Sequence, residues 1–562
     1  MIEYKLYIYL GGTVMSILKT IQKIIEKVLA DMGISQSLDF KVEVPPQDDL
    51  GDFSTNAAFL CSKILRKSPK VVADEISEKL RQLDTFVRVD NINGFINMFL
   101  DHSVYQMTCA GIISNPRNIG KSNIGNGENI QFEFVSPNPT GPLTIAHGRQ
   151  AVIGDVLCNI FDESGYNVQR ELYINDAGQQ IEYLSKSVWI RYNELFGIKH
   201  ELPEDGYHGE YIIDVAKEFK NEYGDKYKDI WNEEVNDFFK EYSLKKMLSM
   251  IKQTLKRLGV NFDVYFSEKL LIKEKIVSRI LDTLEKSDST YAKDDAVWFK
   301  VSKYIDENDK VLIRSTDNRA TYFCDDIAYH YYKYHRGFTK VYDIWGADHQ
   351  GHIPRMKASM KALEIPDDFF NVILHQFVTL KKGDEVVRMS KRAGNFVTLD
   401  DLIEEVGTDA TRYFFAMIDP DTPMNFDLEL AVKKSSDNPV FYVQYAHARI
   451  SSILKQAEER KIDFKMFEGL SEVKEKEELL LIKELSLFSN VVAEAAKNKK
   501  TNFITTYLEK VSSRFHTFYT KHSILNTENP QLIQARLNIC LATKIILERG
   551  LALLGVSAPE KM

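Results

Sequence analysis

Residues 133–149 are Glu133-Phe134-Val135-Ser136-Pro137-Asn138-Pro139-Thr140-Gly141-Pro142-Leu143-Thr144-Ile145-Ala146-His147-Gly148-Arg149, and this stretch decides the fold class. Apolar residues alternate at positions 130, 132 and 134, as in a β-strand, and recur at helical spacing over 151–161. The prolines and Gly141 allow no regular structure between these two patterns. The stretch therefore predicts a loop that leads from the end of a strand into a helix.

Such a corner binds phosphate, because the free N–H groups and the positive dipole end of the helix point at the loop. His147, in the first helical turn, is placed to donate a hydrogen bond to a phosphate oxygen whose charge grows in a transition state. A lone loop histidine is more often a surface residue. Three prolines together with Gly141 and His147 at the end of a first sheet strand favour the phosphate site.

The sequence around this corner predicts a parallel nucleotide-binding sheet. Residues 168–174 form the next strand pattern, which completes a βαβ unit. Residues 341–345 predict another strand, which leads through Gly346-Ala347-Asp348 into a helical pattern at 355–363. We therefore expect a Rossmann-type α/β domain. Ligands bind at the carboxyl ends of its strands, which places Gly346 and Asp348 near the adenosine of a nucleotide.

A second motif is Arg388-Met389-Ser390-Lys391-Arg392-Ala393-Gly394-Asn395, which follows a predicted hairpin whose turn is Lys382-Gly383-Asp384. Lys391 carries a compact ammonium on a long stem, which suits it to neutralise a departing pyrophosphate. A basic loop on its own is more often solvated surface.

In this order the two segments resemble the two signatures of class I aminoacyl-tRNA synthetases, His-x-Gly-His and Lys-Met-Ser-Lys-Ser. The first segment departs from its signature at Thr144, in place of the first histidine, and at Ala146, in place of the glycine. The resemblance implies ATP-dependent activation of an amino acid and its transfer to tRNA, with His147 and Lys391 as catalytic residues. The ATP-binding residues that it implies are Pro139, Gly141, Thr144, His147, Gly148, Gly346, Asp348, Met389, Ser390 and Lys391.

Further segments resemble the arginyl-tRNA synthetase family, and they are residues 51–57, 133–138, 322–328, 345–349, 438–449 and 554–562. A guanidinium presents five N–H donors in a planar fork, so a selective site needs carboxylates placed for in-plane hydrogen bonds. Tyr322 and Asp326 are four residues apart and share one face if that stretch is helical, although an isolated pair would be ordinary helix surface. The arginine-binding residues implied by the resemblance are Glu133, Tyr322 and Asp326 for the guanidinium, with Ser136, Asn138 and His349.

The chain divides into three expected domains around this site. We expect an N-terminal α+β domain at 15–117 that contacts the tRNA body, a catalytic domain at 118–428 with a helical insertion at about 181–289, and an all-helical anticodon-binding domain at 429–562. An amphipathic helical pattern begins at Met15, so we interpret residues 1–14 as an extra N-terminal segment.

The last domain contains a helical stripe of aromatic and basic residues. Tyr442, Tyr445 and Arg449 recur at spacings of three and four, and such a stripe is usually core. We favour a mixed role, in which a partly exposed tyrosine also stacks on an anticodon base. The tRNA-binding candidates are Tyr442, Tyr445, Arg449 and Met562.

The composition limits the ligands and the compartment. With 44% hydrophobic and 27% charged residues the chain is typical of a globular protein, and no apolar run reaches the roughly 20 residues that cross a bilayer. Five dispersed cysteines indicate a reducing, cytoplasmic compartment and no structural zinc or other bound metal. The net charge of −9 is a global sum that does not exclude tRNA. The expected ligands are arginine, ATP with Mg²⁺ and tRNA(Arg), without an obligate protein partner.

Three alternatives stay open at this point. Another class I synthetase, such as the cysteine or lysine enzyme, shares the signatures, although the cysteine enzyme calls for clustered zinc-ligand cysteines. A nucleotidyltransferase that makes an adenylate without tRNA would have no use for the long helical C-terminal domain. A catalytically silent synthetase-like RNA-binding protein is favoured by Thr144 and Ala146 but disfavoured by His147 and Lys391.

Overall fold

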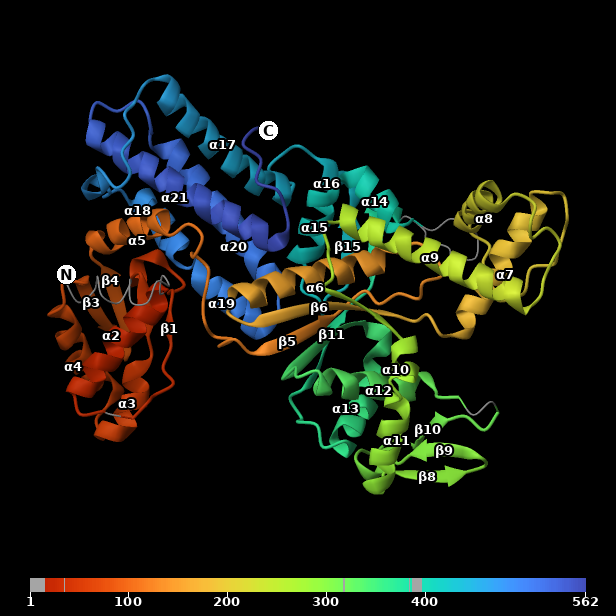
Figure 1. The fold of residues 1–562 in the computed structure, drawn as a ribbon. Coiled ribbons are helices and arrows are strands. Elements are labelled where there is room, and N and C mark those ends of the chain that lie inside the picture. The colour runs from red at the N-terminus through yellow and green to blue at the C-terminus, as the bar shows by residue number, and fades with distance from the viewer. Residues whose placement is uncertain (1–15, 35, 317–318, 384, 387–396) are drawn as a thin grey trace.

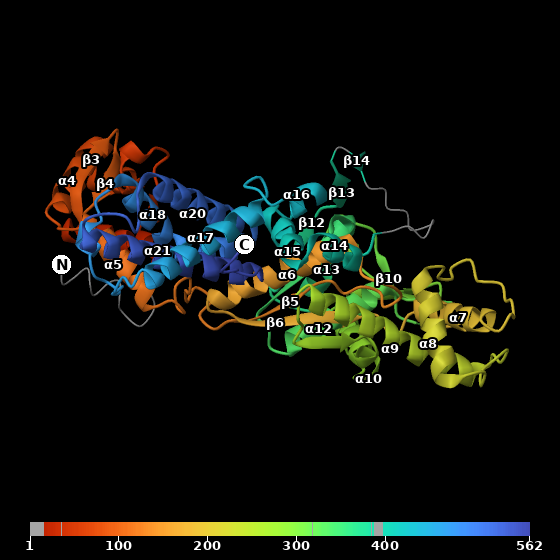
Figure 2. The same cartoon turned by 90° about the horizontal axis from the view of Figure 1, so that it is seen from above.

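The computed structural model describes residues 16–34, 36–316, 319–383, 385–386 and 397–562. The predicted extra segment 1–14 and the motif residues Met389, Ser390 and Lys391 lie outside the described residues, so those interpretations stay predictions. Figures 1 and 2 show an elongated molecule in which the catalytic sheet lies between an N-terminal α+β domain and a helical insertion, and a helical bundle runs along one side.

The catalytic domain is built on a five-stranded parallel sheet in the order β12-β11-β5-β6-β7. The chain adds strands on one side of β5 and then returns to its other side, so the strand order reverses between β5 and β11. Ligands bind at such a switch point, beside the carboxyl ends of the strands. The Rossmann-type prediction is confirmed. The strands are β5 (Asn129–Glu133), β6 (Asn167–Ile174), β7 (Val264–Ser267), β11 (Lys340–Gly346) and β12 (Phe370–His375).

Helix α6 (Ile145–Glu163) joins β5 to β6 and is buried along most of its length. Two of its glycines permit this close packing. A Cβ at Gly148 would lie 2.4 Å from the Leu399 side chain, and a Cβ at Gly154 would lie 2.3 Å from the ring of Phe134. Any larger residue at these positions would push α6 away from its neighbours.

The helical insertion is shorter than the predicted range 181–289. It consists of α7 (Gln179–Glu194), α8 (Glu210–Tyr223) and α9 (Glu233–Arg257), and the range also contains β7, which belongs to the parallel sheet. The prediction missed β7 because this four-residue edge strand buries only Phe266, too little for a periodic pattern. After β7 come α10 (Lys269–Lys273), α11 (Ile276–Lys286), β8 (Thr290–Lys293), β9 (Ala296–Phe299), η2 (Val301–Lys303), β10 (Lys310–Ile313), α12 (Tyr322–His335), η3 (Ala347–His352) and α13 (Ile353–Ala362).

The N-terminal domain has the predicted α+β architecture. Its antiparallel sheet has the order β1-β2-β4-β3. Helix α5 continues from it toward the helical bundle, where it packs against α18 (Lys476–Ser486) and α21 (Pro530–Leu554) (Figure 1). The elements are α2 (Ile17–Asp31), β1 (Val42–Glu43), η1 (Asp48–Leu50), β2 (Phe53–Thr55), α3 (Ala57–Leu65), α4 (Pro69–Arg81), β3 (Phe86–Ile92), β4 (Phe95–Leu100) and α5 (His102–Ser114).

The region after β12 forms a short connection and then the predicted helical bundle. The connection contains the predicted hairpin, in which β13 pairs antiparallel with β14. Its elements are β13 (Val378–Lys382), β14 (Glu385–Val386), α14 (Leu399–Val406), α15 (Thr408–Met417) and β15 (Met424–Asp427). The bundle contains α16 (Leu428–Val432), α17 (Pro439–Glu459), η4 (Leu470–Glu472), α18 (Lys476–Ser486), α19 (Phe488–Asn498), α20 (Asn502–Lys521) and α21 (Pro530–Leu554).

A buried arginine ties the bundle to the catalytic domain. The guanidinium of Arg412, on α15, donates to the carboxylate of Asp155 on α6 at 2.5 Å, to the Leu258 carbonyl at 2.9 Å and to the Leu554 carbonyl at 2.8 Å. The end of α21 is therefore fixed to the helix that follows the phosphate corner. Across the described parts of the chain, none of the helices combines the length and apolar character needed to span a bilayer.

Candidate active site

The loop after β5 has a strained backbone. Val135 and Ser136 have φ angles of +71° and +29°, in a region that L-residues and β-branched residues above all seldom adopt. This turn brings Ser136 back over the strand end, where its hydroxyl donates to Oε1 of Glu133 at 2.9 Å and accepts from the Tyr173 N–H at 3.0 Å. Strain of this kind is held at functional sites by the surrounding structure.

His147 is oriented by the residue that departs from the family signature. Thr144 is the N-cap of α6, and its backbone N–H donates to Nδ1 of His147 at 3.1 Å. The Thr144 hydroxyl lies 3.1 Å from the same nitrogen. Because the backbone N–H can only donate, Nδ1 is an acceptor, and a neutral ring carries its proton on Nε2. The substitution at Thr144 therefore retains a group that sets the tautomer of His147.

The loop that contains the predicted ATP-binding residues Pro139 and Gly141 packs closely against α8. The Tyr211 hydroxyl of α8 donates to the Thr140 carbonyl at 2.9 Å, and a Cβ at Gly141 would lie 3.0 Å from that hydroxyl. The insertion thus packs on the loop that contains Gly141 and the buried Pro139. The packing of Gly148 against Leu399 accounts for that glycine, and its contact with ATP stays a prediction.

Across the switch point, β11 ends at Gly346 and the chain enters η3. A Cβ at Gly346 would lie 2.5 Å from the carboxylate of Asp348, which is exposed. His375 ends the neighbouring strand β12, and burial, with the charge of Arg149, lowers its pKa to about 4. His375 is therefore a neutral imidazole at pH 7, and sequence analysis did not single it out.

Helix α12 begins at Tyr322, which confirms that Tyr322 and Asp326 share a helical face. A carboxylate oxygen of Asp326, Oδ2, lies 2.9 Å from Nε2 of His352. Tyr322 is 62% exposed, with its hydroxyl near Gly178 at the start of α7. The contacts of Tyr322 and Asp326 with arginine stay predictions.

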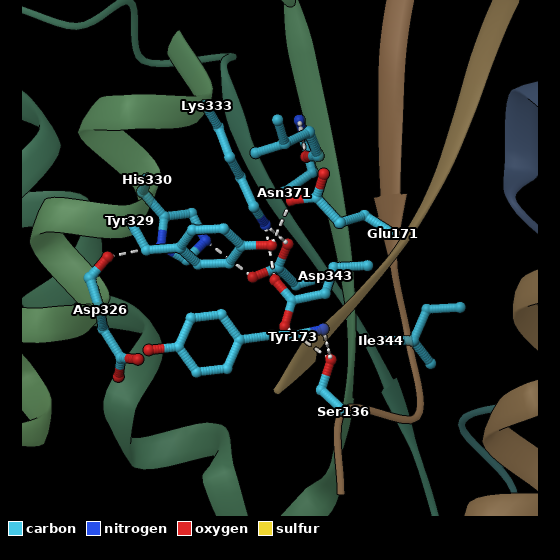
Figure 3. Close-up of polar contacts among 12 residues, drawn as sticks. Ser136, Glu171, Tyr173, Asp326, Tyr329, His330, Lys333, Asp343, Ile344 and Asn371 are labelled. Atoms are coloured by element: carbon cyan, nitrogen blue, oxygen red, sulfur yellow. Dashed lines mark hydrogen bonds and ion pairs between the residues drawn. The ribbon is translucent and has the colours of Figure 1, made fainter. Parts of the chain in front are cut away.

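Glu133, the last residue of β5, makes an ion pair with a lysine that sequence analysis missed. Nζ of Lys333 lies 2.6 Å from Oε2 of Glu133. It also lies 3.0 Å from Oδ1 of Asp343 (Figure 3). Burial raises the pKa of Glu133, and Lys333 opposes that rise. Burial also disfavours the ammonium, but Asp343 and Glu133 outweigh this and raise the pKa of Lys333. Lys333 is therefore a buried cation.

Three further carboxyl groups, those of Glu268, Asp325 and Asp326, lie near the Tyr173 hydroxyl. The Tyr173 hydroxyl donates to Oε2 of Glu268 at 3.0 Å, and in Figure 3 it points toward Asp326. Burial, followed by the charges of Glu268 and Asp326, raises the pKa of Asp325 to about 7. These clustered carboxyl groups give this part of the protein an electrostatic potential that favours a cation.

The remaining predicted arginine residues are less enclosed. Asn138 is exposed beyond the end of β5, and its side-chain oxygen accepts from Nδ2 of Asn175 at 3.4 Å. His349 is exposed on η3, with Nε2 at 3.6 Å from a carboxylate oxygen of Asp348. The described contacts of His349 are thus with its own turn and the nearby ring of Trp345, not with Glu133 or Asp326.

One group of possible metal ligands occurs among the residues that the structure describes, and it is Glu133, His330 and Asp343. The ammonium of Lys333 contacts both of these carboxylates, so a side chain of the protein supplies the cation there. The five cysteines are all buried and carry free thiols.

The predicted tRNA stripe on α17 is neither core nor fully exposed. The rings of Tyr442 and Tyr445 lie 4.9 Å and 5.8 Å from that of His516 on α20. The Arg449 guanidinium lies 5.1 Å from the Tyr445 ring and 5.3 Å from the ring of Tyr519. The three stripe residues are half-buried, and the predicted candidate Met562 is 55% exposed.

Family models of known proteins match three successive parts of the chain. Residues 19–100 match the arginyl tRNA synthetase N terminal domain, residues 109–426 the class I (R) tRNA synthetase catalytic domain, and residues 443–562 the DALR anticodon binding domain. An arginine–tRNA ligase of Thermotoga maritima is 54% identical over 96% of this chain and 99% of its own length. One of Caldanaerobacter subterraneus is 45% identical over 93% and 94%.

Solved structures of arginyl-tRNA synthetases have the same fold as this chain. Thermus thermophilus arginyl-tRNA synthetase superposes with a TM-score of 0.75 at 19% identity, over 97% of this chain and 100% of that chain. The comparisons do not favour the other class I synthetases or a catalytically silent RNA-binding protein. The chain belongs to the arginyl-tRNA synthetase family, the class I enzymes that ligate arginine to tRNA.

Proposed function

We propose that the chain forms arginyl-adenylate at the carboxyl ends of β5 and β11 and then transfers arginine to the 3′-terminal adenosine of tRNA(Arg). One observation carries this proposal. The same loop begins at Glu133, whose ion-pair partner Lys333 lies on α12 with Asp326, and ends at His147 in the first turn of α6. A cation-binding group and a phosphate-binding corner therefore flank one strand end.

In the first step a carboxylate oxygen of arginine attacks the α-phosphorus of the ATP–Mg²⁺ complex. The bond to the bridging oxygen breaks, and pyrophosphate leaves. In the second step a ribose hydroxyl of the terminal adenosine attacks the acyl carbon, and AMP leaves. Neither step needs a protein nucleophile, so catalysis rests on positioning and on charge stabilisation.

Two side chains act on the phosphates. Nε2–H of His147 donates to an α-phosphate oxygen as its negative charge grows, because Nδ1 is occupied by Thr144. Lys391 neutralises the departing pyrophosphate. The remaining predicted ATP contacts come from the loop, from the end of β11 and from the second motif, and they are Pro139, Gly141, Thr144, Gly148, Gly346, Asp348, Met389 and Ser390.

Arginine recognition uses the charge at the strand ends. Glu133 and Asp326 accept from the guanidinium, and Tyr322 at the start of α12 covers it. Ser136 holds Glu133 in place through its 2.9 Å hydrogen bond. Asn138 and His349 face the amino-acid end of the substrate.

The outer domains bind the tRNA. The N-terminal domain has a cavity of about 380 Å³, with the exposed ring of Phe95 and the polar residues Asn93 and Asn97 in its lining. An exposed ring beside amide groups suits an unpaired base of the tRNA body, which stacks and hydrogen-bonds. Tyr442, Tyr445, Arg449 and Met562 contact the anticodon.

The enzyme works in the cytoplasm without a structural zinc, a membrane or an obligate protein partner.

The test of the proposed activity is arginine-dependent ATP–pyrophosphate exchange, with and without tRNA. We expect exchange that requires arginine and is strongest with tRNA present. Exchange that proceeds equally with any amino acid would contradict the proposal.

A further inference from the structure

Helix α12 presents one polar face that runs from the predicted arginine site into the core. Tyr322, Asp326, His330 and Lys333 follow at spacings of four, four and three, so they lie on the same side of the helix. The first two belong to the proposed arginine site. His330 and Lys333 are buried. Burying an ammonium is costly, and a hydrophobic residue of similar volume is often at least as stable, so stability alone does not explain Lys333.

We propose that Lys333 is a specificity-determining residue, whose ammonium keeps Glu133 an anionic acceptor so that the site selects a guanidinium over a neutral urea of the same shape. The inference rests on the proposed contact of Glu133 with arginine. Lys333 itself does not touch the substrate, so it acts through Glu133 as a positioning residue.

The geometry leaves Glu133 able to bind Lys333 and the guanidinium of arginine at the same time. Nζ of Lys333 contacts only Oε2 of Glu133, at 2.6 Å, while Oε1 accepts from the exchangeable hydroxyl of Ser136 at 2.9 Å. A carboxylate has about four lone-pair sites, so two of its hydrogen bonds leave room for a guanidinium N–H. Lys333 therefore fixes the plane and charge of Glu133 without filling its acceptor sites.

Lys333 is held at this place by further contacts. Its Nζ also donates to Asp343 at 3.0 Å and lies 4.3 Å from the centre of the Tyr329 ring. Oδ2 of Asp343 lies 2.7 Å from Nε2 of His330, and Nδ1 of His330 lies 2.8 Å from the Asp326 carbonyl. Figure 3 shows this chain of contacts between α12 and β11. It links the backbone of one proposed guanidinium ligand, Asp326, to the side chain of the other.

The charge of Glu133 depends on this lysine. Burial favours the neutral carboxyl and raises the pKa of Glu133, and Lys333 is the first of the opposing influences. Without the ammonium, Glu133 takes up a proton more readily, and a protonated carboxyl can donate to a urea oxygen but attracts a guanidinium poorly. The titratable groups around the Glu133–Lys333 pair are Tyr329 and His330 of α12, Asp343 of β11 and Glu171 of β6.

Citrulline is the matching probe, because a neutral urea replaces the guanidinium of arginine. The experiment compares the KM of arginine with the Ki of citrulline as a competitor in tRNA-supported ATP–pyrophosphate exchange. For Lys333→Met we expect the ratio of the citrulline Ki to the arginine KM to fall at least about tenfold at pH 7. A loss of this size is expected when one polar contact that distinguishes two ligands is removed. The ratio should recover toward the wild-type value as pH rises, because higher pH favours the ionised form of Glu133. Lys333→Arg should restore it at pH 7.

Lys333→Met leaves two buried carboxylates without a cation and can fail to fold. The double variant Lys333→Met/Asp343→Asn removes one of these charges, and we expect the same loss of discrimination from it. Asp343→Asn alone is the matched control. It should keep the wild-type ratio, because the contact between Lys333 and Glu133 remains and a neighbouring negative charge is gone. Circular dichroism and melting temperature show which variants fold.

Glu133→Gln separates this inference from the proposed function. If Glu133→Gln leaves the KM of arginine unchanged, Glu133 does not contact arginine, and both ideas are wrong. If Glu133→Gln raises that KM while the folded Lys333 variants keep the wild-type ratio at every pH, Lys333 is only structural and the inference alone is overturned. A fall in the ratio for both Lys333→Met variants but not for Asp343→Asn supports it.

Discussion

Nδ1 of His147 accepts a hydrogen bond from the backbone N–H of Thr144 over 3.1 Å. The family signature has a histidine at position 144, so this chain orients the proposed catalytic histidine, His147, with a shorter side chain and with the backbone itself. The backbone donor does not depend on the residue type. We therefore attribute the tautomer of His147 mainly to the N-cap geometry of α6.

The first prediction concerns this pair. His147→Ala should lower kcat for adenylate formation by about 10²–10³, the usual effect of losing one donor to a developing charge, with little change in the KM of arginine. Thr144→Val keeps the backbone donor and should cost less than about tenfold. Single-turnover adenylate formation with tRNA bound measures both. A His147→Ala enzyme with normal kcat and a raised arginine KM would refute the role.

The second prediction concerns Lys391. We propose that its ammonium acts on charge that develops at the phosphates, so Lys391→Ala should reduce kcat while the KM of arginine stays near its wild-type value. Pyrophosphate exchange at saturating and limiting arginine separates the two parameters. The assignment is wrong if the loss lies in arginine KM. Lys391→Arg serves as the control that retains the charge.

The third prediction follows from the pKa of about 7 at Asp325, which burial, Glu268 and Asp326 raise. An unfolded aspartate has a pKa of about 3.9, so the folded state holds this proton more tightly. The stability from that proton is complete below about pH 4 and is lost as pH rises through about 7. Asp325→Asn should therefore raise the melting temperature relative to wild type more at pH 8 than at pH 5. An equal shift at both pH values would show that Asp325 is not buried as a neutral acid.

The fourth prediction concerns the α17 stripe. Because Tyr442 and Tyr445 are half-buried against His516, single replacement by Ala should lower thermal stability modestly and also weaken discrimination between normal and anticodon-mutated tRNA. Stacking on one base contributes about 1 to 3 kcal/mol, which sets the expected range for a tyrosine that contacts the anticodon. Charging kinetics on both tRNAs, beside melting curves, measure the two effects. If both variants melt early yet discriminate as before, the stripe is core and the anticodon is bound elsewhere, near Met562.

The sequence predicted the parts of the fold whose signals are local. The strand, loop and helix around residues 130–161 have complete periodic patterns, and they appear as β5 and α6. Strand β7 lacks such a pattern, since it has four residues and one buried side chain. Only its pairing with β6 identifies it as part of the sheet.

Site residues that belong to one sequence motif could be predicted. Contacts between residues far apart in the sequence could not. Sequence analysis placed Tyr322 and Asp326 on one helical face but did not extend that face to Lys333. The partner of Lys333 was not predictable either, because Lys333 and Glu133 are 200 positions apart. Thr144 could be recognised as a departure from the signature, yet capping boxes normally have Glu or Gln three residues on. The contact with His147 therefore required the structure.

We propose that acidic groups at the end of β5 and near the start of α12 select arginine, and charging of tRNA(Arg) with each natural amino acid measures this selection. We predict that arginine alone is charged. Lysine should be rejected by a factor of about 10⁴ to 10⁵ in kcat/KM, because its single ammonium leaves part of a fork-shaped polar site unpaired. Charging with lysine at a rate comparable to that with arginine would show that these acidic groups do not select a guanidinium.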